Sequence, residues 1–416
     1  MTSQTDLALD AIWRIEAPKL IAGLTRIVRD IGRAEELAQD AFVAALTQWP
    51  SEGVPRNPGA WLMTTAKRRA IDLVRRDVSL ERKTEELGRD LSAASYDDGF
   101  AAANEEIGDD LLRMMFVVCH PILSKEARVA LALRFLGGLT TGEIARAFLV
   151  PEPTIAQRIV RGKRTLAEAH VPFEVPAGSE RAERLRSVLE SIYLIFNEGY
   201  AATAGADVLR PELVEDALRL GRVLAGLVPE EPEVHGLVAL MEIQASRMRA
   251  RVDPSGGPIL LADQDRGRWN HLLIRRGLDA LARAEALSGT LGTYTLQGAI
   301  AACHARAGTF AETDWTRIAA LYDALAQLVP TPVVRLNRAV AVGMAYGPQD
   351  ALDLVDALRD EPTLKAYHLL PSVRGDLLFK LDRRSEARAE FERAAALTQN
   401  VRDQKYLRER AAACRF

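Results

Sequence analysis

The spacing of apolar residues predicts helices along nearly the whole chain. Apolar side chains recur every three or four positions in AIWRIEAPKLIAGLTRIV, in AEELAQDAFVAALTQW and in GAWLMTTAKRRAIDLVRR. This spacing gathers them on one face of an α-helix, whereas a strand would alternate them. The breaks between such stretches contain proline and glycine, as in PSEGVPRNPG (50–59) and VPFEVPAGS (171–179). The pattern therefore predicts an all-α protein divided at these breaks.

The breaks divide the chain into two small helical modules and a long helical extension. A chain of 416 residues exceeds one typical core, so two or more domains are expected. We predict a first module at 8–84, a linker at 85–108, a second module at 109–170 and an extension at 180–416.

The extension contains a weak internal repeat. The windows Gly308–Leu325, Met344–Glu361 and Lys380–Leu397 each bracket a helix. Trp315, Ala351 and Ala387 are spaced 36 residues apart in these windows, and Tyr322, Leu358 and Ala394 follow seven residues later. This period resembles that of tetratricopeptide repeats, which stack helical hairpins. A plain helical bundle would give similar spacing, so both architectures stay open at this point.

Individual segments of the chain differ strongly in charge, although the net charge of the whole chain is only −3. Residues 56–84 hold eight basic and three acidic residues, and residues 124–170 hold eight basic and four acidic ones. Residues 85–112 between them hold nine acidic residues and one basic residue. Two basic modules joined by an acidic connector favour a partner with its own strong charge, such as nucleic acid.

The sequence offers no chemistry typical of an enzyme. The six histidines and three cysteines (Cys119, Cys303, Cys414) are scattered, without HExxH or zinc-ligand spacing, and phosphate-binding glycine motifs are absent. Adjacent Cys119 and His120 point in different directions on a helix, so packing is their expected role. We predict no catalytic site, metal or cofactor. The cysteine usage, the start MTSQTDLALDAIWRIE and the lack of an apolar run near 20 residues predict a cytoplasmic protein without a membrane segment.

The stretch TTGEIARAFLVPEPTIAQRIVRGKRTL (140–166) predicts two short helices joined by a tight corner. Thr140 or Thr141 caps the first helix, with Glu143 placed for a capping box. Pro151 and Pro153 suit the first turn of the second helix, and Leu149 occupies a corner where glycine is common. This geometry favours a DNA-reading helix-turn-helix over a merely solvated basic face. The predicted DNA-binding residues are Glu152, Thr154, Gln157, Arg158, Arg161, Lys163 and Arg164.

Within this second helix, early and late positions suit different contacts. Gln157 and Arg158 carry bidentate groups that match base edges, and the later cations suit phosphates. The first basic module offers a second candidate set, in which aromatic and basic groups would grip unstacked bases. It comprises Trp61, Thr64, Lys67, Arg68, Asp72, Arg75 and Arg76. For Trp61 a core anchor is the favoured interpretation, and the base-stacking alternative stays open.

Taken together, the segments 34–50, 59–76 and 123–166 resemble the extracytoplasmic-function (ECF) sigma factors of bacterial RNA polymerase. The resemblance implies that the first module is sigma region 2, which docks on the clamp helices of the largest polymerase subunit and opens the −10 element. Gln39, Asp40 and Phe42 fall on the docking positions. It implies that the second module is sigma region 4, which reads the −35 element beside the polymerase flap. Arg68 stands where family members often carry asparagine.

The segment RLRSVLESIYLIFNEGYAAT (184–203) and the long helical region after it resemble the sigma-factor subgroup with a large tetratricopeptide-like C-terminal extension. The resemblance implies that the extension regulates or supports activity, and that a protein or small-molecule regulator would act there. Core RNA polymerase and promoter DNA are the other expected partners. Two rival hypotheses remain: a one-component helix-turn-helix regulator with a ligand-sensing tail, and an adaptor whose tail binds a peptide.

Two stretches of the extension allow two interpretations each. Asn197 and Glu198 either tie the extension to the DNA-binding half or end a helix before Gly199. The charged residues around Trp269 in ILLADQDRGRWN (259–270) form either a ligand pocket or a structural loop.

Overall fold

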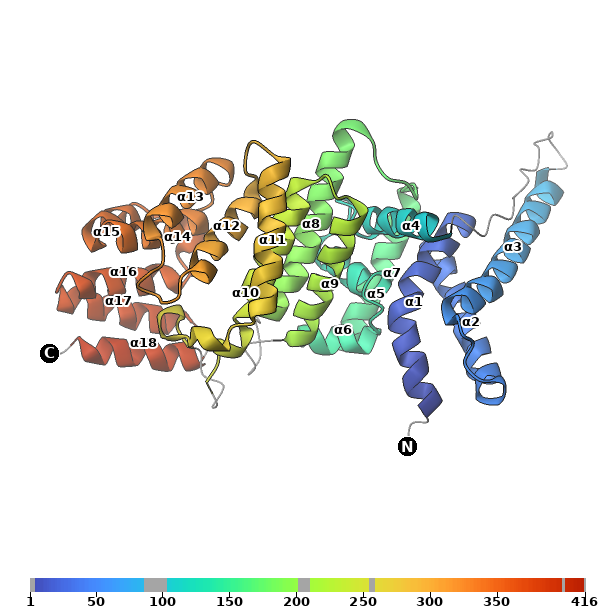
Figure 1. Cartoon of the computed structure of the whole chain (residues 1–416), viewed down its shortest axis with the longest axis horizontal. Coiled ribbons are helices and arrows are strands. Elements are labelled where there is room, and N and C mark those ends of the chain that lie inside the picture. Colours follow the sequence, from blue (N-terminus) through green and yellow to red (C-terminus); the bar gives the residue numbers. More distant parts are fainter. Residues whose placement is uncertain (1–3, 86–102, 201–209, 254–258, 399–400, 415–416) are drawn as a thin grey trace. The chain divides into compact units, whose positions relative to one another are not determined.

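The chain folds into helices and connecting turns (Figure 1). The computed structural model describes residues 4–85, 103–200, 210–253, 259–398 and 401–414. In these ranges every helix is α or 3-10 and no β-strand occurs, so the all-α prediction is confirmed. Two compact units are present: Met1–Ala206 with Arg210–Leu227, and Asp207–Leu209 with Val228–Phe416.

The first unit contains nine described helices. They are α1 (Gln4–Val28), α2 (Ile31–Glu52), α3 (Pro58–Glu85), α4 (Ala103–Val118), α5 (Lys125–Phe135), α6 (Thr141–Phe148), α7 (Glu152–Glu168), α8 (Gly178–Tyr200) and α9 (Pro211–Leu227). Most of the predicted acidic linker, residues 86–102, lies outside the described residues. Glu85 ends α3, and the linker's last residues open α4.

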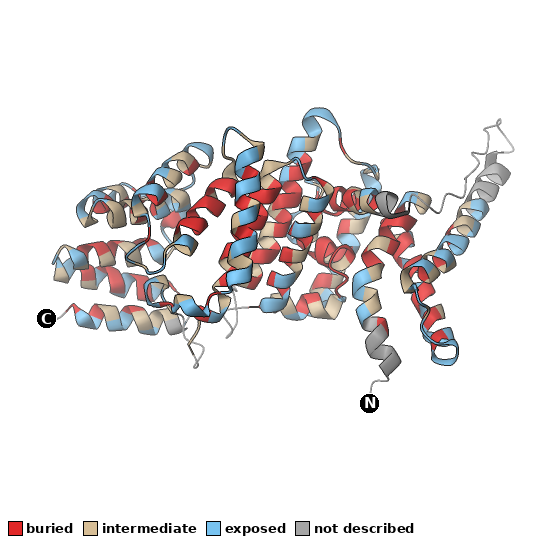
Figure 2. Cartoon of the chain, in the orientation of Figure 1, coloured by how far each residue is buried: buried red, intermediate tan, exposed pale blue. Residues whose placement is uncertain are grey.

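Helices α1, α2 and α3 pack together through a stripe of small and large apolar residues. On α2 the stripe alternates alanines with Leu37, Phe42 and Trp49, all of them buried (Figure 2). Alanines let helix backbones approach closely, and the larger side chains fill the gaps between them. Phe42 meets the edge of Trp13 at 4.7 Å between ring centroids, and Trp49 meets Trp61 at 5.4 Å.

Helix α4 is buried nearly all round at its C-terminal end. Every residue from Met114 to Cys119 is buried. The reason is its position: α4 contacts α1 as well as α5, α8 and α9. A helix covered on all sides must be apolar on all sides. The hairpin α8–α9 lies within the predicted extension, yet it packs in the first unit against α4 and α5.

The second unit is a succession of helices. They are α10 (Pro232–Ser246), α11 (His271–Leu287), α12 (Thr293–Arg306), α13 (Trp315–Leu328), α14 (Pro332–Ala345), α15 (Pro348–Asp356), α16 (Leu369–Lys380), α17 (Arg384–Leu397) and α18 (Val401–Ala413), with 3-10 turns η1 (Met248–Ala250), η2 (Leu261–Asp263), η3 (Arg266–Arg268) and η4 (Pro362–Leu364). From α10 to α18 each helix contacts the next one along the chain. This neighbour-to-neighbour packing is that of stacked helical hairpins.

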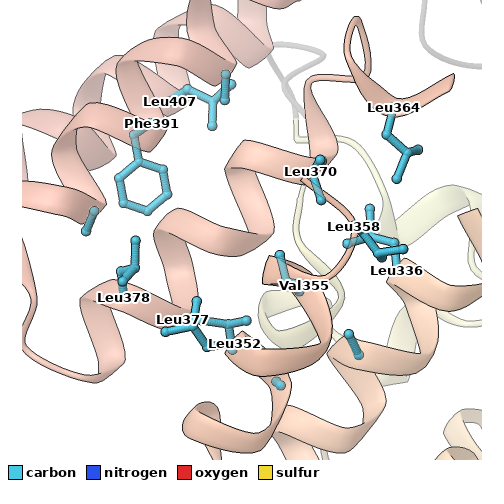
Figure 3. Close-up of a cluster of buried hydrophobic side chains, with 14 of the residues drawn as sticks. Leu336, Leu352, Val355, Leu358, Leu364, Leu370, Leu377, Leu378, Phe391 and Leu407 are labelled. Carbon is cyan, nitrogen blue, oxygen red and sulfur yellow. The ribbon is translucent and has the colours of Figure 1, made fainter. Parts of the chain in front are cut away.

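The predicted repeat positions fall in the core of this stack. Ala351 and Ala387 are fully buried, as are Leu358 and Ala394 seven residues later. They belong to a cluster in which Val355 of α15, Leu377 of α16 and Phe391 of α17 lie together (Figure 3). In the first window Trp315 and Tyr322 are only half-buried, because that hairpin packs against a separate cluster around Leu296 and Ile318.

The loop around Trp269 is a structural element. The indole is 3% exposed and lies close to two guanidinium groups, those of Arg247 at 5.4 Å and Arg266 at 4.8 Å from the ring centroid. Arg266 also donates to the backbone oxygens of Ala307, at 2.7 Å, and His304. These contacts favour the structural interpretation of this loop, because the ring is buried and the Arg266 cation binds the loop to the end of α12.

Histidine 304 makes the second unit sensitive to acid. Burial, followed by the nearby Arg247 and Arg266 charges, lowers the pKa of His304 to about 4. Its Nδ1 has no hydrogen-bond partner among the described residues. Between about pH 6.5 and pH 4, His304 is therefore protonated in the unfolded chain but neutral in the folded unit. The stability of the second unit falls as the pH falls through this range.

We therefore expect the melting temperature of the second unit to drop between pH 7 and pH 4.5. The free energy of unfolding should fall by up to about 1.4 kcal/mol per pH unit where the dependence is steepest. The His304→Gln variant should show a flatter dependence in calorimetry. Exposed His271, replaced by glutamine, serves as control and should leave the dependence unchanged. Parallel pH curves for wild type and His304→Gln would contradict the assignment.

Candidate nucleic-acid interface

Helices α6 and α7 form the predicted pair joined by a tight corner. The Thr140 hydroxyl accepts from the Glu143 backbone N–H at 3.2 Å, and the Glu143 carboxylate accepts from the Thr140 N–H at 2.8 Å. This is the capping box that the sequence predicts. Ile144 and Ala145 are the buried face of α6. The start of the first helix is thus fixed by local chemistry.

The corner is built around Leu149 in the left-handed conformation, with φ of 50°. The Leu149 N–H donates to Arg146 O at 3.2 Å, and the Val150 N–H donates to Ala145 O at 3.1 Å. These bonds satisfy carbonyls that the end of α6 would otherwise leave open. Pro151 then precedes α7, and Pro153 lies in its first turn. A leucine therefore occupies a turn that usually favours glycine, with its side chain exposed.

Helix α7 divides the predicted DNA-binding residues into two groups. Its buried face consists of Ile155, Ile159, Gly162 and Leu166. Glu152, Gln157, Arg161 and Arg164 are exposed, whereas Thr154, Arg158 and Lys163 are half-buried. Arg164 carries a surface ion pair with Glu168, at 2.6 Å. Gln157, Arg161 and Arg164 lie on the side of α7 opposite its buried face, whereas Glu152 lies in the first turn.

Of the half-buried cations, one is paired within the first unit and another lines a cavity. Arg158 lines a cavity of about 350 Å³ formed where α5, α6, α7 and α8 meet, together with Glu126 and Glu198. Lys163 donates to the Glu35 carboxylate of α2 at 3.1 Å. The same carboxylate also forms an ion pair with Arg134 of α5, at 2.7 Å. Spacing along α7 could not distinguish these side chains from the exposed ones.

Helix α3 carries the second basic face. Thr64, Lys67, Arg68, Asp72, Arg75 and Arg76 are all exposed. Thr64, Arg68, Asp72 and Arg75 follow each other at helical spacing and therefore share one side. Trp61 is half-buried, with its ring against Trp49. That contact favours the core-anchor interpretation of Trp61 while leaving part of its ring at the surface.

Helix α2 exposes a mixed polar and apolar face. Gln39 and Asp40 are exposed, and Asp40 pairs with Arg69 of α3 at 3.4 Å. Phe42 is only 7% exposed, because it lies in the same stripe as Ala38 and Ala45. Its position therefore makes it a core residue of the α1–α3 bundle.

Two apolar residues of α2 lie at the surface and were missed by reasoning from the sequence. Val43 is 59% exposed and Leu46 is 50% exposed, on the same side as Gln39. The signal was present in the sequence: both fall outside the alanine-rich stripe that defines the buried face. Apolar side chains at helix positions that should face water are typical of a docking surface.

The chemistry of Cys119 and His120 agrees with a packing role. Burial raises the pKa of the Cys119 thiol to about 11, so the reactive thiolate is scarce at neutral pH. Burial and the Arg184 charge lower the pKa of His120 to about 4. Among the described residues no cluster of histidine, cysteine or carboxylate side chains could hold a metal ion. The helices in those ranges also include none long and apolar enough to span a membrane.

Comparison with protein families decides the affiliation of the front half. The model for sigma-70 region 2 matches residues 12–79, and that for sigma-70 region 4 matches residues 113–166. The ECF RNA polymerase sigma factor SigK of Mycobacterium sp. (strain KMS) is 30% identical over 38% of this chain and 81% of its own length. The chain belongs to the ECF RNA polymerase sigma factors.

Other relatives extend the likeness further along this sigma factor. The uncharacterized protein R00370 of Rhizobium meliloti (strain 1021) is 43% identical over 98% of this chain and 95% of its own length. The probable ECF sigma factor SigI of Mycobacterium tuberculosis (strain H37Rv) is 25% identical over 42% of this chain and 59% of its own. A family of unknown function, DUF6596, matches residues 184–285, which span α8 to α11. No solved structure was found to match.

Proposed function

We propose that this sigma factor brings bacterial core RNA polymerase to promoters that carry two separate elements. In this proposal α2 docks on the clamp helices of the largest subunit, α3 holds the opened −10 strand, and α7 reads the −35 element. The observation that carries the proposal is the presence of three exposed faces on three helices of the two sigma regions, each with chemistry suited to one task.

The α2 face supports docking on protein. Val43 and Leu46 give it exposed apolar area, and Gln39 adds a group that can form hydrogen bonds at the rim. An apolar centre with a polar edge is typical of protein–protein interfaces. The α3 face supports binding of a single strand, because its exposed cations would follow the phosphates.

The α7 face supports reading of a duplex. Gln157 and Arg161 are exposed one turn apart, so both reach the same groove when the helix enters it. Arg164 lies three residues after Arg161, nearly one more turn along the helix, and its position suits a contact with a phosphate. Arg158 is half-buried and lines the cavity together with Glu126, so we assign the base contacts to Gln157 and Arg161.

We expect Gln157→Ala and Arg164→Ala to have different kinds of effect on DNA binding. Gln157→Ala should cost about 1–3 kcal/mol on cognate DNA and relax the preference at one −35 base pair. Arg164→Ala should weaken binding to all sequences and reduce the salt slope by about 1, because it removes one phosphate contact. Salt-dependent binding of polymerase holoenzyme to promoter and scrambled −35 templates measures both. Identical effects of the two variants would contradict the placement of α7.

The proposal itself is tested with purified chain and core polymerase. A stable complex at low salt, with specific run-off transcription from a two-element promoter, is the expected result. A one-component regulator would instead bind a palindromic site as a dimer without polymerase. Failure to associate with core polymerase, together with such stand-alone binding, would overturn the proposal.

A further inference from the structure

Helix α6, the first helix of the DNA-reading pair, is held at both ends by arginines that follow α8. Arg219 of α9 donates from Nη1 to Leu136 O at 3.1 Å and from Nη2 to Gly137 O at 3.2 Å, in the turn before α6. Arg210, just before α9, donates to Ala147 O in the last turn of α6. These contacts lie at the two joints that set the direction of α6 and of α7 after it.

The contacts are chemically suited to hold those joints. Leu136, Gly137 and Ala147 lie at helix ends, where carbonyls lack partners within their own helix and carry the negative end of the helix dipole. A guanidinium satisfies such carbonyls with several donors in a fixed plane. Each arginine is also oriented by a carboxylate: Arg219 by Asp216 at 2.9 Å, and Arg210 by Glu198 of α8.

The hairpin that carries these arginines is itself fixed to the base of the second module. Arg184 of α8 donates to Phe116 O at 3.0 Å, and the Ser187 hydroxyl donates to Cys119 O at 2.6 Å. Arg128 of α5, with a side chain 7% exposed, pairs with Glu190 of α8 at 3.0 Å. The hairpin is therefore anchored on α4 and α5 while its arginines reach the ends of α6.

Glu198 resolves one of the open interpretations of the sequence. Helix α8 continues through Gly199 to Tyr200, so Asn197 and Glu198 do not end it. Gly199 instead permits a close approach, because a Cβ there would lie 2.8 Å from the Val214 backbone nitrogen. Glu198 thus belongs to the contact between the hairpin and α6, as the tie interpretation predicts.

We propose that Arg210 and Arg219 are positioning residues for −35 reading, and that the α8–α9 hairpin is a working part of the DNA-reading module. The inference rests on the proposed function of α7. Neither arginine is needed to touch DNA: both act by fixing the two turns that flank α6. Without them, α7 would remain folded and exposed but would meet the groove in a range of orientations, and base selectivity would fall.

The test uses the full-length chain with Arg210→Ala and Arg219→Ala, singly and together. Exposed Arg186→Ala on α8 is the matched control. Holoenzyme is compared on a promoter mapped by run-off transcription and on the same promoter with the −35 element scrambled. We expect the double variant to lose roughly tenfold in the ratio of the two outputs, while its affinity for core polymerase and the output from the scrambled template stay at wild-type levels.

A conservative replacement separates positioning from simple stability. Arg219→Lys keeps the charge but cannot serve both carbonyls in one plane, so it should recover the melting temperature more fully than the selectivity ratio. Selectivity that follows melting temperature across all variants would overturn the inference, as would an unchanged ratio in the double variant. Gln157→Ala is run alongside: if it too leaves the ratio unchanged, the failure lies in the proposed −35 role of α7 instead.

Discussion

Replacing Val43 and Leu46 together by aspartate is expected to abolish binding to core RNA polymerase while leaving the sigma factor folded. Both side chains are largely exposed, so the free protein loses little packing. In the proposed complex they would be buried against the clamp helices, where an unpaired carboxylate is strongly unfavourable. We expect affinity to fall at least about a hundredfold, which corresponds to roughly 2.7 kcal/mol. Titration of labelled core polymerase measures the change.

Gln48→Asp is the matched control for this experiment. It adds one negative charge, half that of the double variant, to the same helix, but at an exposed position on the other side from Val43. Its affinity should stay within a factor of about two, because residues outside the centre of an interface contribute little. A Phe42→Ala variant is informative as a contrast. It should lower stability rather than affinity, since Phe42 packs in the core against Trp13.

Much of the fold could be read from the periodicity of the chain. The buried repeat alanines Ala351 and Ala387 follow from a period of 36 residues. The capping box at Thr140 and the prolines that open α7 follow from local rules. Such features depend on residues within one or two helical turns of each other. The sequence holds all the partners for them in one short stretch, and this explains why they are predictable.

The distribution of side chains between surface and core was less predictable. Phe42 and Val43 are neighbours, and only the direction of the alanine stripe decides which one is buried. Lys163 and Arg164 are likewise neighbours in one basic run. Lys163 meets Glu35, which lies 128 residues earlier, and nothing near Lys163 in the sequence indicates that contact.

The packing position of α8 and α9 could not be predicted from the sequence, for a related reason. The proline-rich break at 171–179 shows where a helix ends, but a break carries no information about the surface on which the next helices pack. What decided their place is a set of long-range polar contacts, among them that between Arg184 and Phe116 O, 68 residues apart. Individual arginines in an arginine-rich chain do not identify such partners.

Replacing Glu35 by alanine is expected to destabilise the first unit by about 3 kcal/mol. The Glu35 side chain is 8% exposed and joins α2 to the DNA-reading module through Arg134, 15% exposed, and Lys163. Removing one member of a buried ion pair leaves its partner's charge without compensation, and this typically costs about 3–5 kcal/mol. In a unit of this size the loss lowers the melting temperature by roughly 6–12 °C. Calorimetry of the full-length chain measures it as a shift of the first unit's transition.

Exposed Glu36 provides the control, because it is the adjacent carboxylate on the same helix. Glu36→Ala should change stability by no more than about 0.5 kcal/mol. Glu35→Gln should fall between the two, since its amide oxygen still accepts one hydrogen bond but offers no charge to Arg134. Equal melting temperatures for Glu35→Ala and Glu36→Ala would mean that Arg134 and Lys163 find other partners. The contact between the α1–α3 bundle and the DNA-reading module would then depend on bonds such as that of Trp13 on α1, whose indole N–H donates to Gly138 O at 3.1 Å, and not on charge.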